Sequence, residues 1–591
     1  MTNSRRIVLA LFIVLPTWPA SGAEPSLVSI FPMGITRGES VEIQLSGTGL
    51  QEPQRVLFSR ATIQLESRPE GRIAFRVERD TPQGEGDLWV LTPTGLSNPR
   101  RFVVNDLPMV VERAKEDPAG SAPVVKPPVI IAGTIDTPTD QDDYSVELDR
   151  DQQISIAFRS VSLEGSVLPA LTVFAPDGQE WMHDRGGEAE PTLDLVAPTR
   201  GIYRIRVQDR AFRRDAASLY QLVIQATPRL VAAFPQLLTK GKRQRVELLG
   251  YRIPGGEPAG EGFAAGLMRL PVNIDAPTSG ERDGAGLTRS HSVMLERFGY
   301  QHPGTSGSIK FELIDGTIVS EISTRHDSAH TAQHVPLGAS IAGRFLQAAE
   351  IDWYRFPAKK GEPIWVEAVG ERAGLAMDLD VAIYDLQGKL LTVFADTPHP
   401  KGSPKSFPLD TLDPMGTWKA PADGEYNLVI RDLYGPSASG PERAYRLTIE
   451  QTQEAVRVVA MHLSETVPRG LSLVPGGHAP LQLLAIRRGG HEAPITIRPL
   501  ILIEGLTAKP ATILANQLSA SLVLDAAAMA PTVAGPIELV AETEVEGQLH
   551  SFSVLGATLG QDGKPPVVRL SDGITAAILA PRNPKSSDAS P

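Results

Sequence analysis

Cysteine is absent from the 591-residue sequence, and aromatic residues make up only 6% of it. The absence of cysteine excludes disulfide bonds, cysteine nucleophiles, cysteine metal ligands and a lipid-bearing cysteine behind an export signal. No stretch approaches the ~20 uninterrupted apolar residues of a membrane-spanning helix, so no span is predicted in the mature chain. The chain also has no excess of cationic residues. The net charge of −12 argues against nucleic acid or an anionic membrane surface as the main partner.

Local catalytic signatures are lacking as well. The segment HEAPI at 491–495 lacks the second histidine of a helical zinc-protease motif, and GTSGS at 304–308 lacks the spacing of a nucleophile elbow. These absences predict a protein that is not an enzyme, although a triad assembled from distant positions would leave no local signature. An exported hydrolase with its site at a domain junction or near His326 is the alternative.

Glycine and proline are abundant, with 53 and 50 residues, and 41% of the chain is hydrophobic. This composition favours many short strands and turns over long helices, with enough apolar residues for packed cores. Because the chain is too long for one core, the sequence predicts several all-β domains.

The amino terminus has the pattern of an export signal. Arg5 and Arg6 precede the apolar run 7–15, and Ser21-Gly22-Ala23 supplies small residues for cleavage. We therefore predict a signal peptide and a periplasmic or extracellular mature protein that begins at Glu24.

Two distant segments repeat one pattern: DQDDYSVEL at 140–148 and AEIDWYRFP at 349–357. At one fixed offset the matched pairs are Gly133/Gly343, Asp142/Asp352, Tyr144/Tyr354, Phe174/Tyr384 and Gly178/Gly388. After insertions confined to loops, Tyr203 matches Tyr426 and Tyr220 matches Tyr445. Each matched segment alternates with the two-residue period of a half-buried strand, which predicts a duplicated antiparallel β-sandwich.

Two kinds of structural residue follow from the repeat. PADGEYNLVI at 421–430 resembles a tyrosine corner, which predicts that Tyr426, and Tyr203 in the first copy, donate to upstream backbone. Alternation places Asp142 on the inward face with Tyr144, and Asp352 with Tyr354. We interpret both aspartates as caps for backbone N–H groups of the adjoining turn, and metal ligation is the alternative.

Other side chains could hold a cation. Asp378, Asp380 and Asp385 in the second copy could offer carboxylates for calcium. We interpret them as an exposed acidic strand edge and predict no cofactor, with calcium as the alternative. His326, His330 and His334 are spaced i, i+4, i+8 and would share one face of a helix. We interpret this segment as an interdomain linker with surface histidines, and a three-histidine site for a divalent ion is the alternative.

A fainter duplication relates FPMGITRGESVEIQLSG at 31–47 to FPQLLTKGKRQRVELLG at 234–250. Small sandwiches therefore alternate with the repeated ones, and the segment from 453 adds a fifth. The predicted organisation is a signal peptide at 1–23, sandwiches at 24–106, 107–226, 227–336, 337–452 and 453–570, and a disordered tail at 571–591.

Gly133, Asp142-x-Tyr144, Phe174-x3-Gly178 and Gly201-x-Tyr203, with their second copy, resemble the bacterial pre-peptidase C-terminal domain. The segment 26–105 resembles the immunoglobulin-like domain of plexins and transcription factors. The resemblance implies a tandem array of jelly-roll-like modules alternating with immunoglobulin-like modules. It also implies an accessory role, since in secreted peptidases such a module lies beside a catalytic domain. This sequence departs from that arrangement, because it contains no recognisable peptidase domain. The sequence therefore predicts a non-catalytic rod of sandwiches that binds a polysaccharide, a protein or a cell-envelope component.

Overall fold

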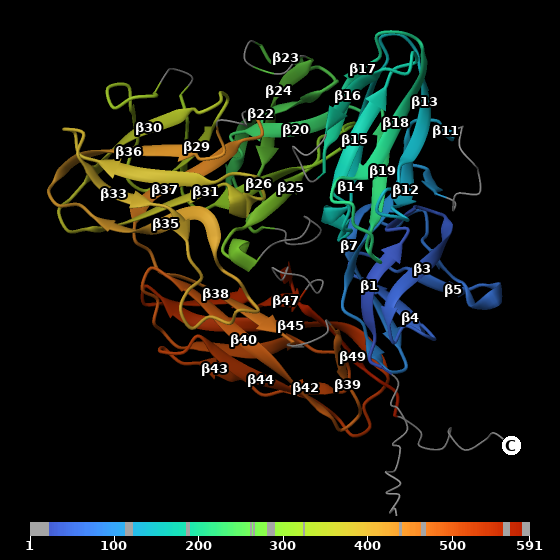
Figure 1. Ribbon diagram of the computed structural model, residues 1–591. Helices are drawn as coiled ribbons and strands as arrows, with labels where there is room; N and C mark the ends of the chain where they lie inside the picture. The colour runs from blue at the N-terminus through green and yellow to red at the C-terminus, as the bar shows by residue number, and fades with distance from the viewer. Residues whose placement is uncertain are drawn as a thin grey trace, which may run out of the picture.

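The computed structural model describes residues 23–112, 122–184, 190–260, 263, 266–280, 290–322, 326–435, 440–462, 469–559 and 568–581. These residues form five successive β-sandwiches, coloured from blue to red along the chain (Figure 1). Their helices include the short 3₁₀ turns η1 (Pro69–Gly71), η2 (Val161–Leu163), η3 (Ser290–Ser292) and η4 (Glu371–Ala373). Within the described ranges, no helix is long and apolar enough to cross a bilayer. The predicted all-β array of sandwiches is confirmed, whereas the predicted signal peptide lies outside the described residues except for Ala23.

The first sandwich spans residues 26–105. One sheet has the order β1 (Ser26–Phe31), β3 (Ser40–Thr48), β6 (Ile73–Arg76) and β5 (Gln64–Ser67). The other has the order β2 (Gly34–Thr36), β9 (Arg100–Asn105), β7 (Gly84–Thr92) and β4 (Arg55–Phe58), with β8 (Gly95–Leu96) paired to β7. Phe75, Leu88 and Phe102 lie in its core, each with 0% exposure.

The second sandwich spans residues 109–225. One sheet has the order β10 (Met109–Val111), β12 (Val129–Thr134), β19 (Leu219–Gln225), β14 (Gln153–Arg159) and β17 (Thr192–Val196). The other has the order β11 (Val124–Val125), β13 (Asp142–Leu148), β18 (Gly201–Asp209), β15 (Pro169–Phe174) and β16 (Glu180–Asp184). The lead strands β10 and β11 pair in parallel with β12 and β13, one on each sheet.

The third sandwich spans residues 229–314 and has smaller sheets. Their orders are β20 (Arg229–Phe234), β22 (Arg243–Tyr251), β24 (Leu267–Asp275), β23 (Glu257–Pro258), and β21 (Leu237–Thr239), β26 (Ile309–Ile314), β25 (Arg297–Tyr300).

The fourth sandwich begins at residue 317, so the predicted domain boundary at 336 is wrong. One sheet has the order β27 (Thr317–Ser320), β29 (Ala339–Arg344), β37 (Ala444–Gln451), β31 (Pro363–Val369), β35 (Thr411–Lys419) and β34 (Asp396–Thr397). The other has the order β28 (Gln333–His334), β30 (Ile351–Ala358), β36 (Gly424–Asp432), β32 (Leu379–Tyr384) and β33 (Leu390–Phe394). The short lead strands β27 and β28 pair in parallel with β29 and β30, as β10 and β11 do in the second sandwich.

The fifth sandwich continues past the predicted boundary at 571. One sheet has the order β42 (Leu506–Ala508), β44 (Ser519–Ala526), β40 (His478–Arg488), β38 (Ala455–Met461), β47 (Leu555–Leu559) and β48 (Val568–Ser571). The other has the order β39 (Leu471–Leu473), β49 (Ile574–Ile578), β45 (Val533–Val545), β41 (Ile495–Ile501) and β43 (Ala511–Ile513), with β46 (Gln548–Ser553) on β45. Strand β49 lies between two partners, and its Ala576 and Ile578 are fully buried, so a disordered tail from 571 is wrong there. Residues 582–591 lie outside the described ranges.

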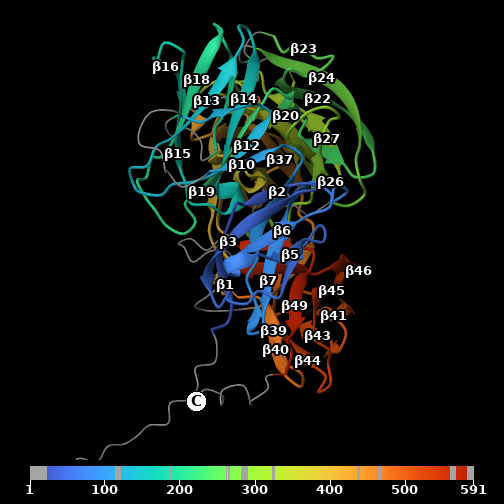
Figure 2. The ribbon, with the colours of Figure 1, turned by 90° about the vertical axis from the view of Figure 1, so that its right-hand side faces the viewer.

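The five sandwiches do not form the predicted rod, because the last one packs against the first (Figures 1 and 2). Trp89 and Leu96 of the first sandwich share an apolar cluster with Ala577 and Leu579 at the end of the fifth. The backbone N–H of Leu96 also donates to Ser472 Oγ at 2.8 Å. The chain therefore folds back on itself into one body.

Candidate functional site

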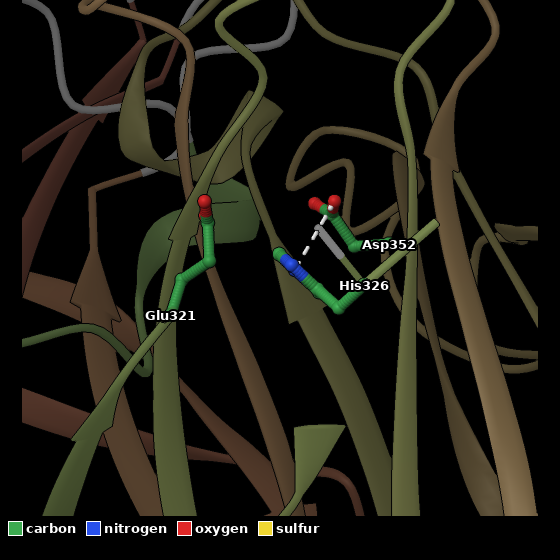
Figure 3. A group of neighbouring side chains, drawn as sticks. All are labelled: Glu321, His326 and Asp352. Atoms are coloured by element: carbon green, nitrogen blue, oxygen red, sulfur yellow. Dashed lines mark ion pairs between the residues drawn. The ribbon is translucent and has the colours of Figure 1, made fainter. Parts of the chain in front are cut away.

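Three metal-ligating side chains converge in the fourth sandwich: Glu321, His326 and Asp352 (Figure 3). Glu321 follows β27, and its backbone N–H donates to Ala342 O at 2.8 Å, which extends the pairing with β29. The carbonyl of His326 accepts from the N–H of Trp353 at 2.8 Å, beside the start of β30. Asp352 points inward because β30 alternates, with Tyr354 on the same face. Backbone pairing thus positions all three side chains.

The geometry of the cluster is close. One ligating atom from each of Glu321, His326 and Asp352 lies within 4.8 Å of the other two. His326 Nε2 lies 3.3 Å from Asp352 Oδ1, and these side chains are only 5% and 2% exposed. The hydroxyl of Tyr445 donates to Asp352 Oδ2 at 2.6 Å and lies 2.7 Å from the hydroxyl of Tyr354. Sequence reasoning expected a turn cap for Asp352, and the structure corrects this, because the carboxylate contacts a tyrosine and a histidine instead.

The two carboxyl groups of the cluster have pKa values above the ordinary carboxyl range. Burial raises the pKa of Asp352 to about 7, although the hydrogen bond from Tyr445 opposes the shift. Burial, with the charge of Asp352, raises the pKa of Glu321 to about 7. Burial also raises the pKa of Tyr354 and of Tyr445 well above the ordinary phenol value. Two carboxyl groups in this setting either keep protons near neutral pH or yield them to a cation.

The donor set suits a divalent transition ion. Glu321 and Asp352 would each supply a carboxylate oxygen, and His326 would supply Nε2. Two oxygens and one imidazole nitrogen are ligands that Zn²⁺ and related ions accept. Among the residues that the structure describes, this is the one group of at least three such side chains whose ligating atoms meet.

The second sandwich repeats most of this arrangement. The hydroxyl of Tyr220 donates to Asp142 Oδ2 at 2.8 Å and lies 2.7 Å from the hydroxyl of Tyr144. Glu112 accepts from the N–H of Thr134 at 2.9 Å, as Glu321 accepts from Arg344 at 2.7 Å. The segment 113–121, which corresponds to the one with His326, lies outside the described residues. The tyrosine–aspartate pair is therefore common to both copies.

The tyrosine corners lie where the sequence placed them. The hydroxyl of Tyr203 donates to Thr199 O at 2.7 Å, and that of Tyr426 donates to Ala422 O at 2.7 Å. Both rings are buried in their sandwich cores. Each tyrosine holds the loop before its own strand by this hydrogen bond, and neither belongs to the cluster of Glu321, His326 and Asp352.

The proposed calcium ligands are not brought together with one another. Asp380 pairs with Arg431 at 2.6 Å. Asp385 accepts from the N–H groups of Gln387 and Lys389 in its own turn. Burial raises the pKa of Asp378, which lies just before β32. The three carboxylates therefore do not form a group of meeting ligands in the structure.

The histidine segment does not form the helix that a three-histidine site would need, and two of its histidines lie at the surface, as the linker interpretation expects. Residues 326–334 are not helical, and His330 and His334 are exposed whereas His326 is buried. The real partners of His326 are Asp352 and Glu321, and Glu321 was missed. The only signal for Glu321 in the sequence is its match with Glu112. The two are separated by one residue less than the pairs of the main repeat.

No family model and no curated protein matches the chain. Among solved structures, the chain is similar to the pre-peptidase C-terminal domain of a collagenase from Bacillus anthracis, with 13% identity over 22% of this chain and 99% of that one, at a TM-score of 0.16. It is also similar to SGBP-B of a Bacteroides ovatus mixed-linkage glucan utilization locus, solved with a mixed-linkage heptasaccharide, with 8% identity, 71% of each chain covered and a TM-score of 0.13. At these TM-scores the sandwich assignment rests on the strands of this chain and not on either likeness.

Proposed function

We propose that this chain is a non-catalytic exported protein that binds a polysaccharide, a protein or a cell-envelope component through β-sandwich modules. The second and fourth sandwiches are proposed to be modules of the pre-peptidase C-terminal type, and the first and third to be immunoglobulin-like. The shared Asp-x-Tyr motif and the tyrosine corners support the first assignment. The terminal segment from Arg5 to Ala23 supports export.

The observation that carries this proposal is the rigid joining of the sandwiches. Arg569 of the fifth sandwich pairs with Asp87 of the first and Glu164 of the second, and its side chain is only 2% exposed. At another junction, buried Glu367 of the fourth sandwich pairs with Arg488 of the fifth at 3.2 Å. Such junctions hold the outer sheet faces at fixed positions, which suits a binding or scaffold protein.

Buried ion pairs also join the third and fourth sandwiches. Arg446 of the fourth sandwich pairs with Glu312 of the third at 3.0 Å and with Glu367 at 3.2 Å. Burial of these groups means that loss of one partner leaves an uncompensated charge. The body is therefore expected to move as a unit.

The Glu321, His326 and Asp352 cluster favours one second candidate, a metal-dependent hydrolase. Catalysis would require substrate to reach the metal, whereas the His326 and Asp352 side chains are 5% and 2% exposed. A structural role for the cluster therefore fits its burial better.

The test asks whether the envelope fraction retains the protein and whether the protein releases a product from that fraction. The mature protein would be incubated with its own envelope fraction, and both its retention and the release of reducing sugars or new peptide amino termini would be measured. We expect retention with no released product. Product release that disappears in Asp352→Asn would replace this proposal with the hydrolase, and absence of retention would refute binding.

A further inference from the structure

The sheet β28-β30-β36-β32-β33 of the fourth sandwich faces away from the neighbouring sandwiches (Figure 1). The opposite sheet makes the junctions: Arg446 on β37 pairs with Glu312, and Trp365 on β31 lies under the guanidinium of Arg488. On β30 and β36, Tyr354 and Leu428 point into the core with 0% exposure. Their neighbours along each strand therefore form the outer face.

Three rows of side chains cross this outer face. The first row contains Ile351, Arg431 and Asp380. The second row contains Trp353, Val429 and Ala382. The third row contains Arg355, Asn427 and Tyr384. Trp353 lies in the second row and Tyr384 in the third, on the two strands that flank β36, so the two residues face each other diagonally across β36.

The two rings lean toward each other over β36. The centroids of Trp353 and Tyr384 are 5.7 Å apart, and the ring planes differ by 31°. Val429 and Ala382 point outward by alternation, yet each is only 8% exposed, so the rings cover them. Both aromatic residues remain half-buried, with part of their surface open to solvent. The result is a shallow aromatic surface on a rigid sheet.

Fixed polar groups border the rings. Arg431 lies 2.6 Å from Asp380 and has a side chain that is 53% exposed. Arg355 donates to Asn427 Oδ1 at 2.9 Å and to Ala329 O at 2.7 Å, which holds its guanidinium plane in place. Glu425 on the same face lies 3.5 Å from His334. Two arginines thus face two carboxylates, and this balance of charge matches an uncharged partner.

The first copy of the repeat lacks this surface. At the matching places the second sandwich has Asp143 and Phe174, and Arg204 lies 4.2 Å from the Phe174 ring centroid. Asp143 pairs with Arg206 at 2.7 Å. Both copies keep the same inward tyrosine–aspartate pair, so the module folds without an outward aromatic pair. The aromatic surface is a separate property of the fourth sandwich.

We propose that this outer face binds a neutral polysaccharide, with a sugar ring stacked on Trp353 and Tyr384. The C–H face of a pyranose is apolar and packs on an aromatic face, while its hydroxyls hydrogen-bond to planar charged side chains at the edge. Arg431, whose side chain is 53% exposed, is the donor best placed for those hydroxyls, and its ion pair with Asp380 holds the guanidinium in position. The proposal rests on the binding function above and names its ligand class and its site.

The test measures affinity for defined polysaccharides. Full-length protein would be run in native gels that contain hydroxyethylcellulose, galactomannan, amylopectin or anionic polygalacturonate, and titrated with the polysaccharide that retards it. We expect retardation by a neutral polysaccharide. Trp353→Leu, which keeps apolar cover over Val429 but removes the aromatic face, is expected to weaken binding by about tenfold or more. Phe174→Leu, at the place in the second sandwich that matches Tyr384, is the control and should bind as the wild type does.

The outcomes distinguish failure of the proposed site from failure of the proposed binding function. Wild-type affinity in both Trp353→Leu and Tyr384→Ala would overturn the site and leave the binding function standing. Retention by envelope protein but by none of the neutral polysaccharides would overturn the carbohydrate class alone. Absence of retention by any envelope material would refute the proposed function itself. If the melting temperature shows that Trp353→Leu is misfolded, the exposed variant Arg431→Gln decides instead, and unchanged affinity there and in Tyr384→Ala would count against the site.

Discussion

Arg569 Nη1 lies 2.8 Å from the carboxylate of Asp87, and the same guanidinium pairs with Glu164. These residues belong to the fifth, first and second sandwiches, and the Arg569 side chain is only 2% exposed. A guanidinium can bridge two carboxylates because its planar fork presents several donors. One side chain near the end of the chain thus joins three cores.

Arg569→Met is expected to lower the stability of the whole body by roughly 3 kcal/mol or more. The change leaves the Asp87 and Glu164 carboxylates buried without the guanidinium that bridges them, beside Arg101 at 3.6 Å and Arg100 at 3.5 Å. Urea unfolding followed by tryptophan fluorescence would measure the midpoint. Arg498→Met is the matched control, because its pair with Glu542 is exposed and should contribute about 1 kcal/mol at most. Equal shifts for the two variants would contradict a stabilising junction.

Tyr203→Phe and Tyr426→Phe are each expected to cost about 1 kcal/mol, the usual loss when a buried hydroxyl loses its hydrogen bond. Each hydroxyl donates at 2.7 Å to a carbonyl of the loop before its own strand. Phenylalanine keeps the ring and its packing, so the effect isolates the hydrogen bond. Calorimetry of the two variants would check this, and unchanged unfolding temperatures would refute the structural role of the corners.

Alternation made most of the fold predictable from sequence. Tyr144, Val146 and Leu148 alternate with polar residues, and all three are buried as that period requires. The return of the fifth sandwich to the first was not predictable, because the partners of Arg569 lie in other domains and no local pattern marks them. Strand β49 was missed because its small apolar residues directly precede a polar, proline-bearing terminus.

The candidate site was only half visible in the sequence. The repeat identified Asp352 and Tyr354, since alternation carries both into the core. The spacing of His326 with His330 and His334 would place the three on one face only in a helix, which does not form. Glu321 directly follows a lead strand of four residues, which is too short for a periodic signal. Sequence patterns report local geometry, whereas this cluster is assembled by pairing between segments.

Zn²⁺ is expected to raise the unfolding temperature of the protein at about pH 8, where both carboxyl groups with a pKa of about 7 have lost their protons. A cation at a hundred times its dissociation constant would stabilise the folded state by about 2.7 kcal/mol. Asp352→Asn and His326→Ala should abolish the response. Asp142→Asn in the second sandwich and Asp380→Asn should retain it. A response that survives Asp352→Asn would place the bound metal elsewhere.

Lys310 on β26 should make stability rise with pH above neutrality. It lines a cavity of about 30 Å³ between the third and fourth sandwiches, together with Arg297 and Glu312. Burial, with the charge of Arg297, lowers the pKa of Lys310 to about 8, against about 10.4 for the unfolded chain. Below pH 8 both states are protonated and the folded state bears the full cost of the buried charge. Between the two values only the unfolded state keeps the proton, so the free energy of unfolding increases with pH.

Lys310→Met should therefore stabilise the protein by roughly 1 kcal/mol at about pH 7 and flatten the rise between about pH 8 and about pH 10. Methionine keeps the apolar stem of the side chain and removes the buried charge. Urea midpoints measured across this range would give the slope for each variant. Lys359→Met is the control, because its side chain is 78% exposed and its loss should leave the slope unchanged. A wild-type slope in Lys310→Met would show that another group at this junction gives up the proton.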